Sequence, residues 1–282
     1  MSMTTQQAPA VEDPTPSRRG VHIQARDLRH AFVRDGNAVT ALWDFTLDIP
    51  SGQFVSIVGP SGCGKTTFLQ IVGGLVEPGA GELTIDGESV DGPGDSVGYM
   101  LARDALLPWR SAQRNVEFSL EARKVGKAER AAAARAWLEK VHLGGFEDAR
   151  VTELSQGMRQ RVAIARTLAA EPRCLLMDEP FAALDAQTRA LVQYEFVRIW
   201  ENLRPTVVLI THDLSEAIAL SDRVVLMSHR PGRIVADMEI DLPRPRDEEV
   251  LRDTAFLAYH QELAGLLRHE VDVALSEKEN RS

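Results

Sequence analysis

The sequence predicts an α/β protein in which buried strands form a sheet and one all-helical segment is inserted. Three runs in the second half of the chain are apolar throughout, at residues 174–177, 207–210 and 224–227. Strands covered by helices on both faces have this pattern. Between about 111 and 170, strand-like runs are nearly absent, and the alanines at 131–134 lie among Arg, Glu and Lys. These are strong helix formers, so this segment is predicted to be the helical insert.

Strands and turns are expected before the insert. From residue 21 to about 100, short apolar runs alternate with turns rich in Gly and Asp, as at 54–58 and 83–85. Asp86 and Gly87 follow the second run and form a hairpin-type turn signal.

The two ends of the chain differ in character. The first twenty residues lack the apolar core of a signal peptide and are predicted to be a disordered tail. At the other end, apolar positions between 254 and about 277 predict a closing amphipathic helix. Those positions are Leu257, Leu263, Leu266, Leu267 and Val271.

Composition excludes several classes of protein. A formal net charge of -9 over 282 residues argues against broad affinity for nucleic acid. Two cysteines, Cys63 and Cys174, make no disulfide framework and indicate a reducing compartment. No apolar run is long enough to span a bilayer, so work at a membrane would be done from outside the lipid.

A phosphate-binding loop is the first functional motif. Residues 59–66 read GPSGCGKT and fit the pattern G-x-x-x-x-G-K-[ST]. Glycines let the backbone curl so that several N–H groups point at one anion, and the following helix adds its positive end. Lys65 can reach the β- and γ-phosphates of ATP, and the Thr66 hydroxyl can ligate Mg²⁺. The predicted phosphate-binding residues are Gly59, Pro60, Ser61, Gly62, Cys63, Gly64, Lys65, Thr66 and Thr67. Cys63 occupies a variable position of the pattern and is assigned no redox role.

An acidic pair follows a predicted strand. Four apolar residues precede Asp178 and Glu179. Asp178 is placed to hold the Mg²⁺ shell through water, and Glu179 to act as general base on the attacking water. An isolated Asp-Glu pair is commonly a solvated turn, but the upstream phosphate loop favours the functional interpretation.

The segment between these motifs resembles the signature of the ATP-binding-cassette (ABC) family. Residues 154–161 read LSQGMRQR, similar to the family's L-S-G-G-Q segment, with Gln156 in place of the first glycine. Ser155 alone would be a helix N-cap, a common role for serine. The resemblance implies a second anion site that faces ATP held by another copy of the chain. Its residues are Leu154, Ser155, Gln156, Gly157 and Met158.

The resemblance implies further roles and a domain plan. Asp185 corresponds to the D-loop residue that contacts the opposite protomer, and His212 to the switch histidine that senses the γ-phosphate. Phe32 corresponds to the aromatic that stacks on adenine, although an aromatic in a first strand is commonly core packing. A P-loop NTPase core is implied, with an antiparallel β subdomain and an inserted α-helical subdomain. The expected divisions are a tail over 1–20, the ATP-binding domain over 21–245 with its insert at about 101–170, and a C-terminal helix and polar tail over 246–282.

Finer strings look like the ATPase subunits of nitrate, sulfonate and taurine importers. They include LLPW, RPGRI and LPRPRD. Relatives for other small organic solutes or vitamin precursors carry similar strings. The resemblance implies an ATP-hydrolysing subunit, peripheral at the cytoplasmic face of the cell membrane. Its expected partners are a second copy, two membrane-spanning permease subunits and an extracytoplasmic solute-binding protein, with no nucleic acid. The alternatives are a soluble cassette ATPase acting on nucleic acid or the ribosome, and a nucleotide-binding regulator without turnover.

An apolar cluster and one departure from the family pattern lie in the same loop. Leu106, Leu107 and Trp109 surround a proline, and the resemblance makes them a docking surface for the membrane partner. The alternative is that they pack the insert against the sheet. Ala102 occupies the position of the family's Q-loop glutamine, which reaches Mg²⁺ and the attacking water. Alanine can do neither, so we expect slower or less tightly coupled turnover.

Overall fold

A six-stranded sheet forms the centre of the computed structural model, which describes residues 20–34, 36–246 and 248–279. The strand order is β10-β9-β3-β8-β7-β6. All neighbouring pairs are parallel except β9 and β10, which are antiparallel. The strands are β3 (Phe54–Val58), β6 (Val97–Met100), β7 (Cys174–Asp178), β8 (Thr206–Ile210), β9 (Arg223–Met227) and β10 (Ile234–Glu239).

An antiparallel sheet packs beside this one, with the order β2-β1-β4-β5. At the β4–β5 turn Asp86 and Gly87 have φ of 52° and 82°, the positive values that a tight hairpin turn requires. The predicted turn is therefore present. The strands are β1 (Ile23–Arg34), β2 (Asn37–Ile49), β4 (Ala80–Ile85) and β5 (Glu88–Ser89).

Both faces of the central sheet are covered, which explains why its strands are apolar throughout. On β7, Leu176 faces a core that includes α1 (Lys65–Val72) and the antiparallel sheet. Its neighbour Leu175 faces the opposite core, which includes α5 (Ala186–Leu203). A third core lies between β9, α6 (Leu214–Leu220) and α7 (Thr254–Glu279).

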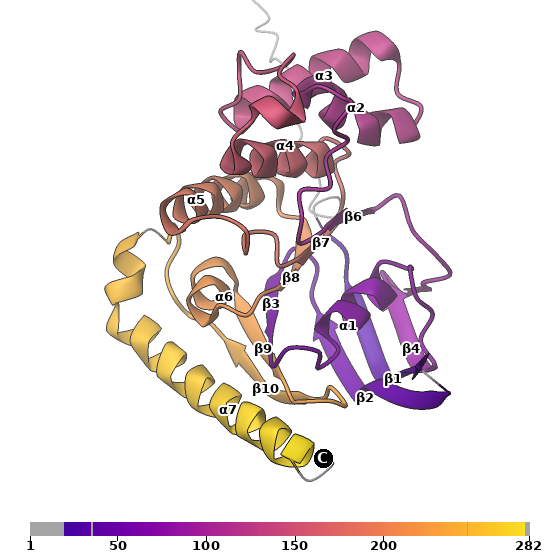
Figure 1. The fold of residues 1–282 in the computed structure, drawn as a ribbon, viewed down its shortest axis with the longest axis vertical. Coiled ribbons are helices and arrows are strands. Elements are labelled where there is room, and N and C mark those ends of the chain that lie inside the picture. The colour runs from indigo at the N-terminus through magenta and orange to yellow at the C-terminus, as the bar shows by residue number, and fades with distance from the viewer. Residues whose placement is uncertain (1–19, 35, 247, 280–282) are drawn as a thin grey trace, which may run out of the picture.

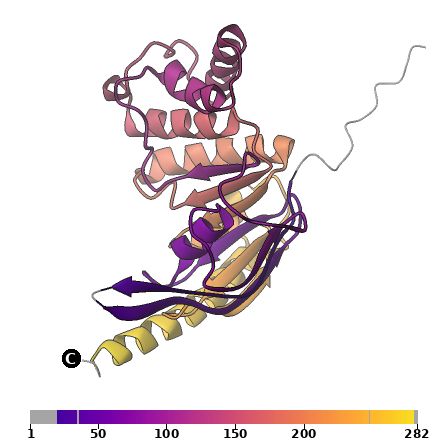
Figure 2. The same cartoon turned by 90° about the vertical axis from the view of Figure 1, so that its right-hand side faces the viewer.

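The predicted helical insert contains three helices stacked beyond the β6–β7 edge of the sheet (Figures 1 and 2). They are α2 (Ala112–Ala122), α3 (Lys127–Lys140) and α4 (Gln156–Leu168), and a short 3-10 helix, η2 (Val151–Glu153), precedes α4. Their apolar residues share one core with α5, so the insert is packed continuously onto the sheet.

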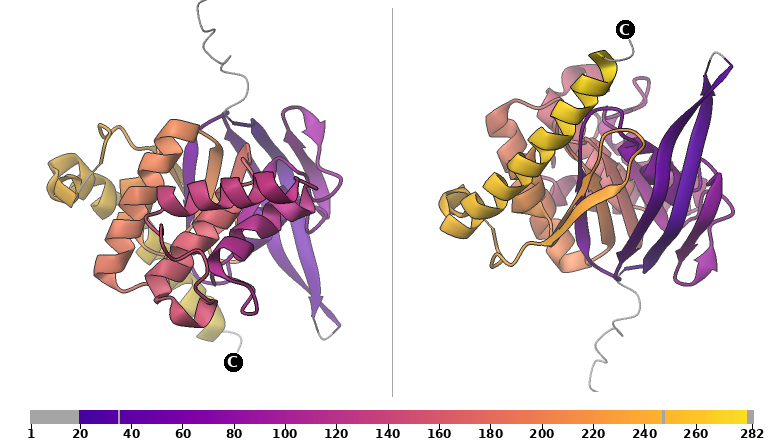
Figure 3. Two further views of the ribbon diagram at one scale, coloured as in Figure 1. Left: turned by 90° about the horizontal axis from the view of Figure 1, so that it is seen from above. Right: turned by 90° about the horizontal axis from the view of Figure 1, so that it is seen from below.

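The C-terminal helix α7 crosses the molecule obliquely on the side of β9 and β10, after a short 3-10 helix, η3 (Glu248–Arg252) (Figure 3). Leu263 is fully buried and Leu266 and Leu267 pack beside it, as an amphipathic helix requires. Leu257 and Val271 are 49% and 38% exposed, so their expected place on the buried face is wrong. The tail predicted over 1–20 lies outside the described residues except for Gly20. Within the described ranges, no helix is long and apolar enough to cross a membrane.

Candidate functional site

The phosphate loop joins β3 to α1 at the carboxyl end of a buried strand. Gly62 and Gly64 have φ of 76° and 121°, backbone conformations that favour glycine. A side chain at Gly64 would also come within 2.6 Å of the Ala41 carbonyl oxygen. Sequence and geometry agree here, because the pattern places glycine where the backbone must curl.

Lys65 lies inside the curl of the loop and is 7% exposed. Its Nζ donates to the carbonyl oxygens of Gly59 at 2.7 Å and Pro60 at 3.1 Å. The ammonium is therefore held at the centre of the loop, where an anion bound by the N–H groups would meet it.

Thr66 and Asp178 bring two hard oxygen atoms together beside Lys65. The Thr66 hydroxyl donates to Oδ1 of Asp178 at 3.3 Å. Burial raises the pKa of Asp178, the hydrogen bond from Thr66 lowers it, and the neighbouring Glu179 raises it again. A hydroxyl and a carboxylate that meet beside a phosphate site fit Mg²⁺, which takes one or two protein oxygens and completes its shell with phosphate and water.

Glu179 and His212 meet at the same edge of the sheet. Oε2 of Glu179 lies 3.2 Å from Nδ1 of His212. Glu179 has φ of 48°, and its backbone N–H donates to Ile210 at 2.9 Å, which ties the ends of β7 and β8 together. The side chains are one-third and two-thirds exposed. A carboxylate in this position can take a proton from water, and the imidazole can orient it.

The signature segment lies at the start of α4. Ser155 caps this helix, and its Oγ accepts from the Met158 N–H at 3.3 Å. Ser155 and Gln156 are exposed, whereas Leu154 is buried. A side chain at Gly157 would come within 2.4 Å of Cγ2 of Thr188, so glycine permits close packing against α5. The exposed first turn can receive an anion from outside the chain.

Asp185 caps α5 and lies on the surface. Its Oδ1 accepts from the Thr188 N–H at 3.1 Å, and hydrogen bonding with Thr188 lowers the pKa of this carboxyl. The phosphate loop and the signature helix α4 lie in separate parts of the fold (Figure 1). One chain therefore does not bring these two segments together.

Residues 42–182 match the family model described as ABC transporter. The chain belongs to the ABC transporter family. This cassette is therefore an ATPase of the P-loop class, with the α/β architecture described above.

Three relatives cover most of the cassette. An uncharacterized ABC transporter ATP-binding protein of Methanocaldococcus jannaschii is 46% identical, over 90% of this chain and 94% of the relative. A nitrate import ATP-binding protein of Synechocystis is 40% identical, over 88% and 96% of the two chains. A taurine import ATP-binding protein of Pseudomonas savastanoi is 45% identical, over 74% and 80%.

A solved structure shares the fold. It is a dimeric ATP-binding cassette in a post-hydrolysis state with ADP and phosphate, 30% identical to this chain, with a TM-score of 0.69. The alignment covers 78% of this chain and all of that one. In that solved protein, the shared fold holds ADP and phosphate in a dimer.

Phe32 lies on β1 of the cassette, in the hairpin that extends from the antiparallel sheet. Its ring is 43% exposed and packs edge-to-face against His30, with the centroids 4.6 Å apart. A ring so exposed is not core packing, and its free face is available for stacking on a planar group.

The loop from β6 to α2 divides the predicted docking residues. Leu106 is 7% exposed and belongs to the core beneath α5, so its assignment to an exposed surface is wrong. Leu107 is half-buried, and Trp109 is 77% exposed. These residues lie between the end of β6 at Met100 and the start of α2 at Ala112, where no helix or strand fixes the direction of successive side chains.

Asn115 holds this loop in place and was not identified from the sequence. It is fully buried, accepts the Leu107 N–H at 2.7 Å, and donates to the Leu107 carbonyl oxygen at 3.2 Å. Arg230 begins the RPGRI string, but its contact with the phosphate loop was not identified: its guanidinium donates to the Gly62 carbonyl oxygen at 2.7 and 3.0 Å. A polar residue within an apolar helical pattern was a usable signal for Asn115. Nothing local indicated the contact of Arg230 with Gly62, which lies 168 residues away in the chain.

Proposed function

We propose that this cassette is the ATP-hydrolysing, energy-coupling subunit of an importer for a small anion or organosulfur solute. One observation carries the proposal: Lys65, the Thr66–Asp178 contact and the Glu179–His212 contact all lie at the carboxyl edge of one sheet. The named functions of the nitrate and taurine import relatives support the solute class.

The phosphate loop binds the triphosphate of ATP through its N–H groups and Lys65. Thr66 and Asp178 would hold Mg²⁺, which supplies charge neutralisation of the phosphate oxygens when bound. Glu179 accepts a proton from the attacking water, and His212 orients Glu179 and contacts the γ-phosphate. Phe32 stacks on the adenine.

Two copies act together in this proposal. Ser155 and Gly157 of one copy complete the ATP site on the other, and Asp185 contacts the opposite copy. The dimeric relative bound to ADP and phosphate supports this arrangement. The closed pair binds ATP better than ADP. Hydrolysis therefore shifts the population from closed to open pairs, and this change of conformation is passed to the membrane subunits.

The membrane side of the proposal rests on the loop after β6. The two copies of the chain dock on two membrane-spanning permease subunits at the cytoplasmic face. In each copy, Trp109, with Leu107 beside it, makes this contact. An extracytoplasmic solute-binding protein delivers the solute. An exposed tryptophan on a loop held by buried Asn115 is a typical anchor for a partner's helix.

Affinity purification of the chain from its own cells in mild detergent tests the proposal. We expect a multi-span membrane protein in equal amount, accompanied by a solute-binding protein encoded nearby. Ribosomes, DNA or the absence of any stable partner would contradict the importer and indicate a soluble cassette ATPase.

A further inference from the structure

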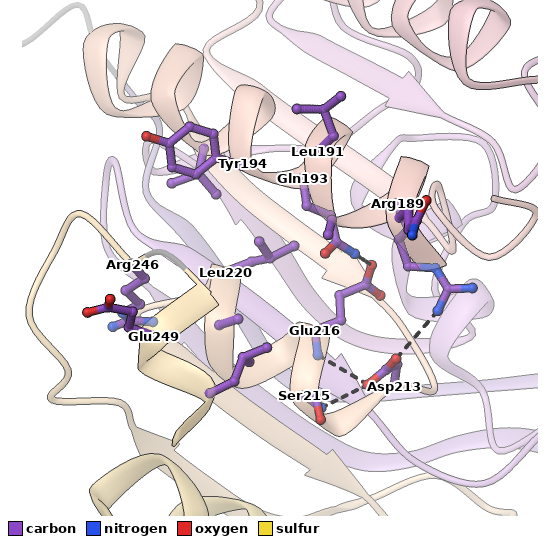
Figure 4. Close-up of a pocket in the computed structure, with 15 residues that line it drawn as sticks. Arg189, Leu191, Gln193, Tyr194, Asp213, Ser215, Glu216, Leu220, Arg246 and Glu249 are labelled. Atoms are coloured by element: carbon purple, nitrogen blue, oxygen red, sulfur yellow. Dashed lines mark hydrogen bonds and ion pairs between the residues drawn. The ribbon is translucent and has the colours of Figure 1, made fainter. Parts of the chain in front are cut away.

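A cavity of 520 Å³ lies between α5, α6 and the segment that leads into α7 (Figure 4). It shares no residue with the phosphate loop, the acidic pair or His212. Its volume is in the range of small-molecule sites, which extends over roughly 300–1,000 Å³. It is thus a separate candidate site.

The outer wall of the cavity is apolar and open to solvent. Leu191 and Tyr194 on α5 are 51% and 42% exposed, and Leu251 on η3 is 42% exposed. Leu220 and Ala219 on α6 continue the apolar surface inward. A ligand with an apolar body would remove this surface from water.

The inner wall carries a buried acid. Glu216 is 8% exposed, and its Oε1 accepts from Nε2 of Gln193 at 2.6 Å. The pKa of Glu216 is raised to about 6, mainly by burial and also by the charge of Asp213, although hydrogen bonds from Thr211 and Gln193 act in the opposite direction. In the described ranges Glu216 forms no ion pair, and Arg189 has the smallest influence on its pKa.

The other charged groups of the cavity do not neutralise this acid. Arg189 lies 3.6 Å from Asp213 and donates to Leu184. Arg246 is buried, and all three of its nitrogens donate to backbone carbonyl oxygens. Both arginines are thus engaged elsewhere, and neither forms an ion pair with Glu216 in the described ranges.

We propose that this cavity binds a small organic cation, an ammonium group carried on an apolar body. The ammonium lies beside Glu216, and the body lies along Leu191 and Tyr194. Burying a carboxylate without a neighbouring cation costs free energy, and an ammonium group bound beside it offsets this cost. The apolar wall alone would accept a neutral ligand equally well, so it is Glu216 that selects the cation.

The position of the cavity links it to nucleotide turnover, an extension that rests on the proposed function. α5 begins directly after Asp185, and α6 begins two residues after His212. A ligand that contacts both helices fixes their spacing, and with it the spacing of these two residues. Occupancy of the cavity is therefore expected to change the ATPase rate.

The test is a calorimetric titration of the full chain, without nucleotide, with 4-phenylbutylamine. 4-Phenylbutanol and 4-phenylbutyrate serve as the neutral and anionic analogues. We expect the amine to bind one-to-one and about 10- to 100-fold more tightly than the alcohol at pH 8, as charged hydrogen bonds allow. Below about pH 6 the preference declines, because Glu216 becomes protonated while the amine stays charged.

Variants keep the proposal falsifiable. Glu216→Gln retains an acceptor for Gln193, and we expect it to lose the preference for the amine and its pH dependence. Ala219→Trp fills the cavity and is expected to abolish binding of both 4-phenylbutylamine and 4-phenylbutanol. Exposed Glu262→Gln on α7 is the matched control and should bind as the unmodified chain does.

The proposal would be overturned if the amine, the alcohol and the carboxylate bound equally well, or if none of them bound. It would also be overturned if Glu216→Gln kept the preference for the amine. The titration contains no ATP, so it does not depend on turnover. If the amine binds as expected but the chain hydrolyses no ATP under any condition, the cavity assignment stands and the proposed function fails.

Discussion

Ala102 lies two residues beyond β6, at the sheet edge where β7 presents Asp178, and its side chain is exposed. A methyl group there can neither ligate a metal nor donate to water. The neighbouring loop is nonetheless well held, since Asp104 accepts from Arg159 at 3.2 Å, and Arg166 donates to its carbonyl oxygen at 2.8 Å. The loop is thus held in place, and only the side chain at position 102 offers no group that could take part in hydrolysis.

We expect Ala102→Gln to raise the ATPase rate and its stimulation by the membrane partner. A regained amide should increase the rate by roughly two- to tenfold, below the ~10²-fold effect of a donor in a fully assembled site. Steady-state ATPase assays with and without the permease measure both quantities. An unchanged rate together with unchanged stimulation would contradict the assigned role of position 102.

Among the elements, the loop between β6 and α2 contains one residue expected to affect stability, Leu106, and one expected to affect docking, Trp109. Leu106→Ala should destabilise the fold by about 2–5 kcal/mol, since it removes a buried side chain from the main core. Trp109→Ala should change stability by about 0.5 kcal/mol or less and reduce recovery of the membrane partner. Urea unfolding and co-purification measure the two effects. Loss of stability in Trp109→Ala with the partner retained would reverse the assignment.

His229, which lies just after the carboxyl end of β9, connects this end of the central sheet to α7. Its Nδ1 lies 2.9 Å from Glu270 and its Nε2 lies 3.1 Å from Glu277, both on α7. The next residue, Arg230, contacts the phosphate loop at Gly62. The hydrogen bond to Glu270 is the main cause that raises the pKa of His229, followed in the same direction by Glu277.

This contact should make stability depend on pH in a defined direction. A raised pKa means that the stabilisation is full below the unfolded value of 6.5 and is lost as pH rises through the folded value. The stability difference between the unmodified chain and His229→Gln should therefore be larger at pH 6 than at pH 9. Urea unfolding at both pH values measures it. An equal difference at both would show that the contact carries no charge-dependent stabilisation.

In the whole molecule, the phosphate loop and the signature segment of one chain lie apart (Figure 1). If they share ATP between two copies, as we propose, dimerisation should depend on ATP. Glu179→Gln removes the general base without altering the phosphate loop. We expect hydrolysis to fall by about 10²–10⁴-fold and an ATP-bound dimer to accumulate. Light scattering with ATP, with ADP and without nucleotide measures the mass. A Glu179→Gln chain that stays monomeric with ATP would contradict the shared site.

Most of the nucleotide site was predictable because its motifs are contiguous. The phosphate loop depends on backbone torsions and on its own helix, so glycine spacing suffices to identify it. The acidic pair and His212 were placed correctly at strand ends, because parallel strands bring their carboxyl ends to one edge. Their contact at 3.2 Å required the pairing of β7 with β8, which no local pattern specifies.

The motifs along the chain were enough to indicate the ABC family, several buried strands, the helical insert and the loop that we propose binds the phosphates. Tertiary structure alone decided which apolar side chains of one loop are buried: Leu106 packs in a core formed by distant helices, whereas Trp109 remains exposed. It also decided that Glu216 lines a cavity with residues of α5 and η3. The physical reason is that motifs arise from neighbours along the chain, whereas burial and charge pairing arise from surfaces that meet only after folding.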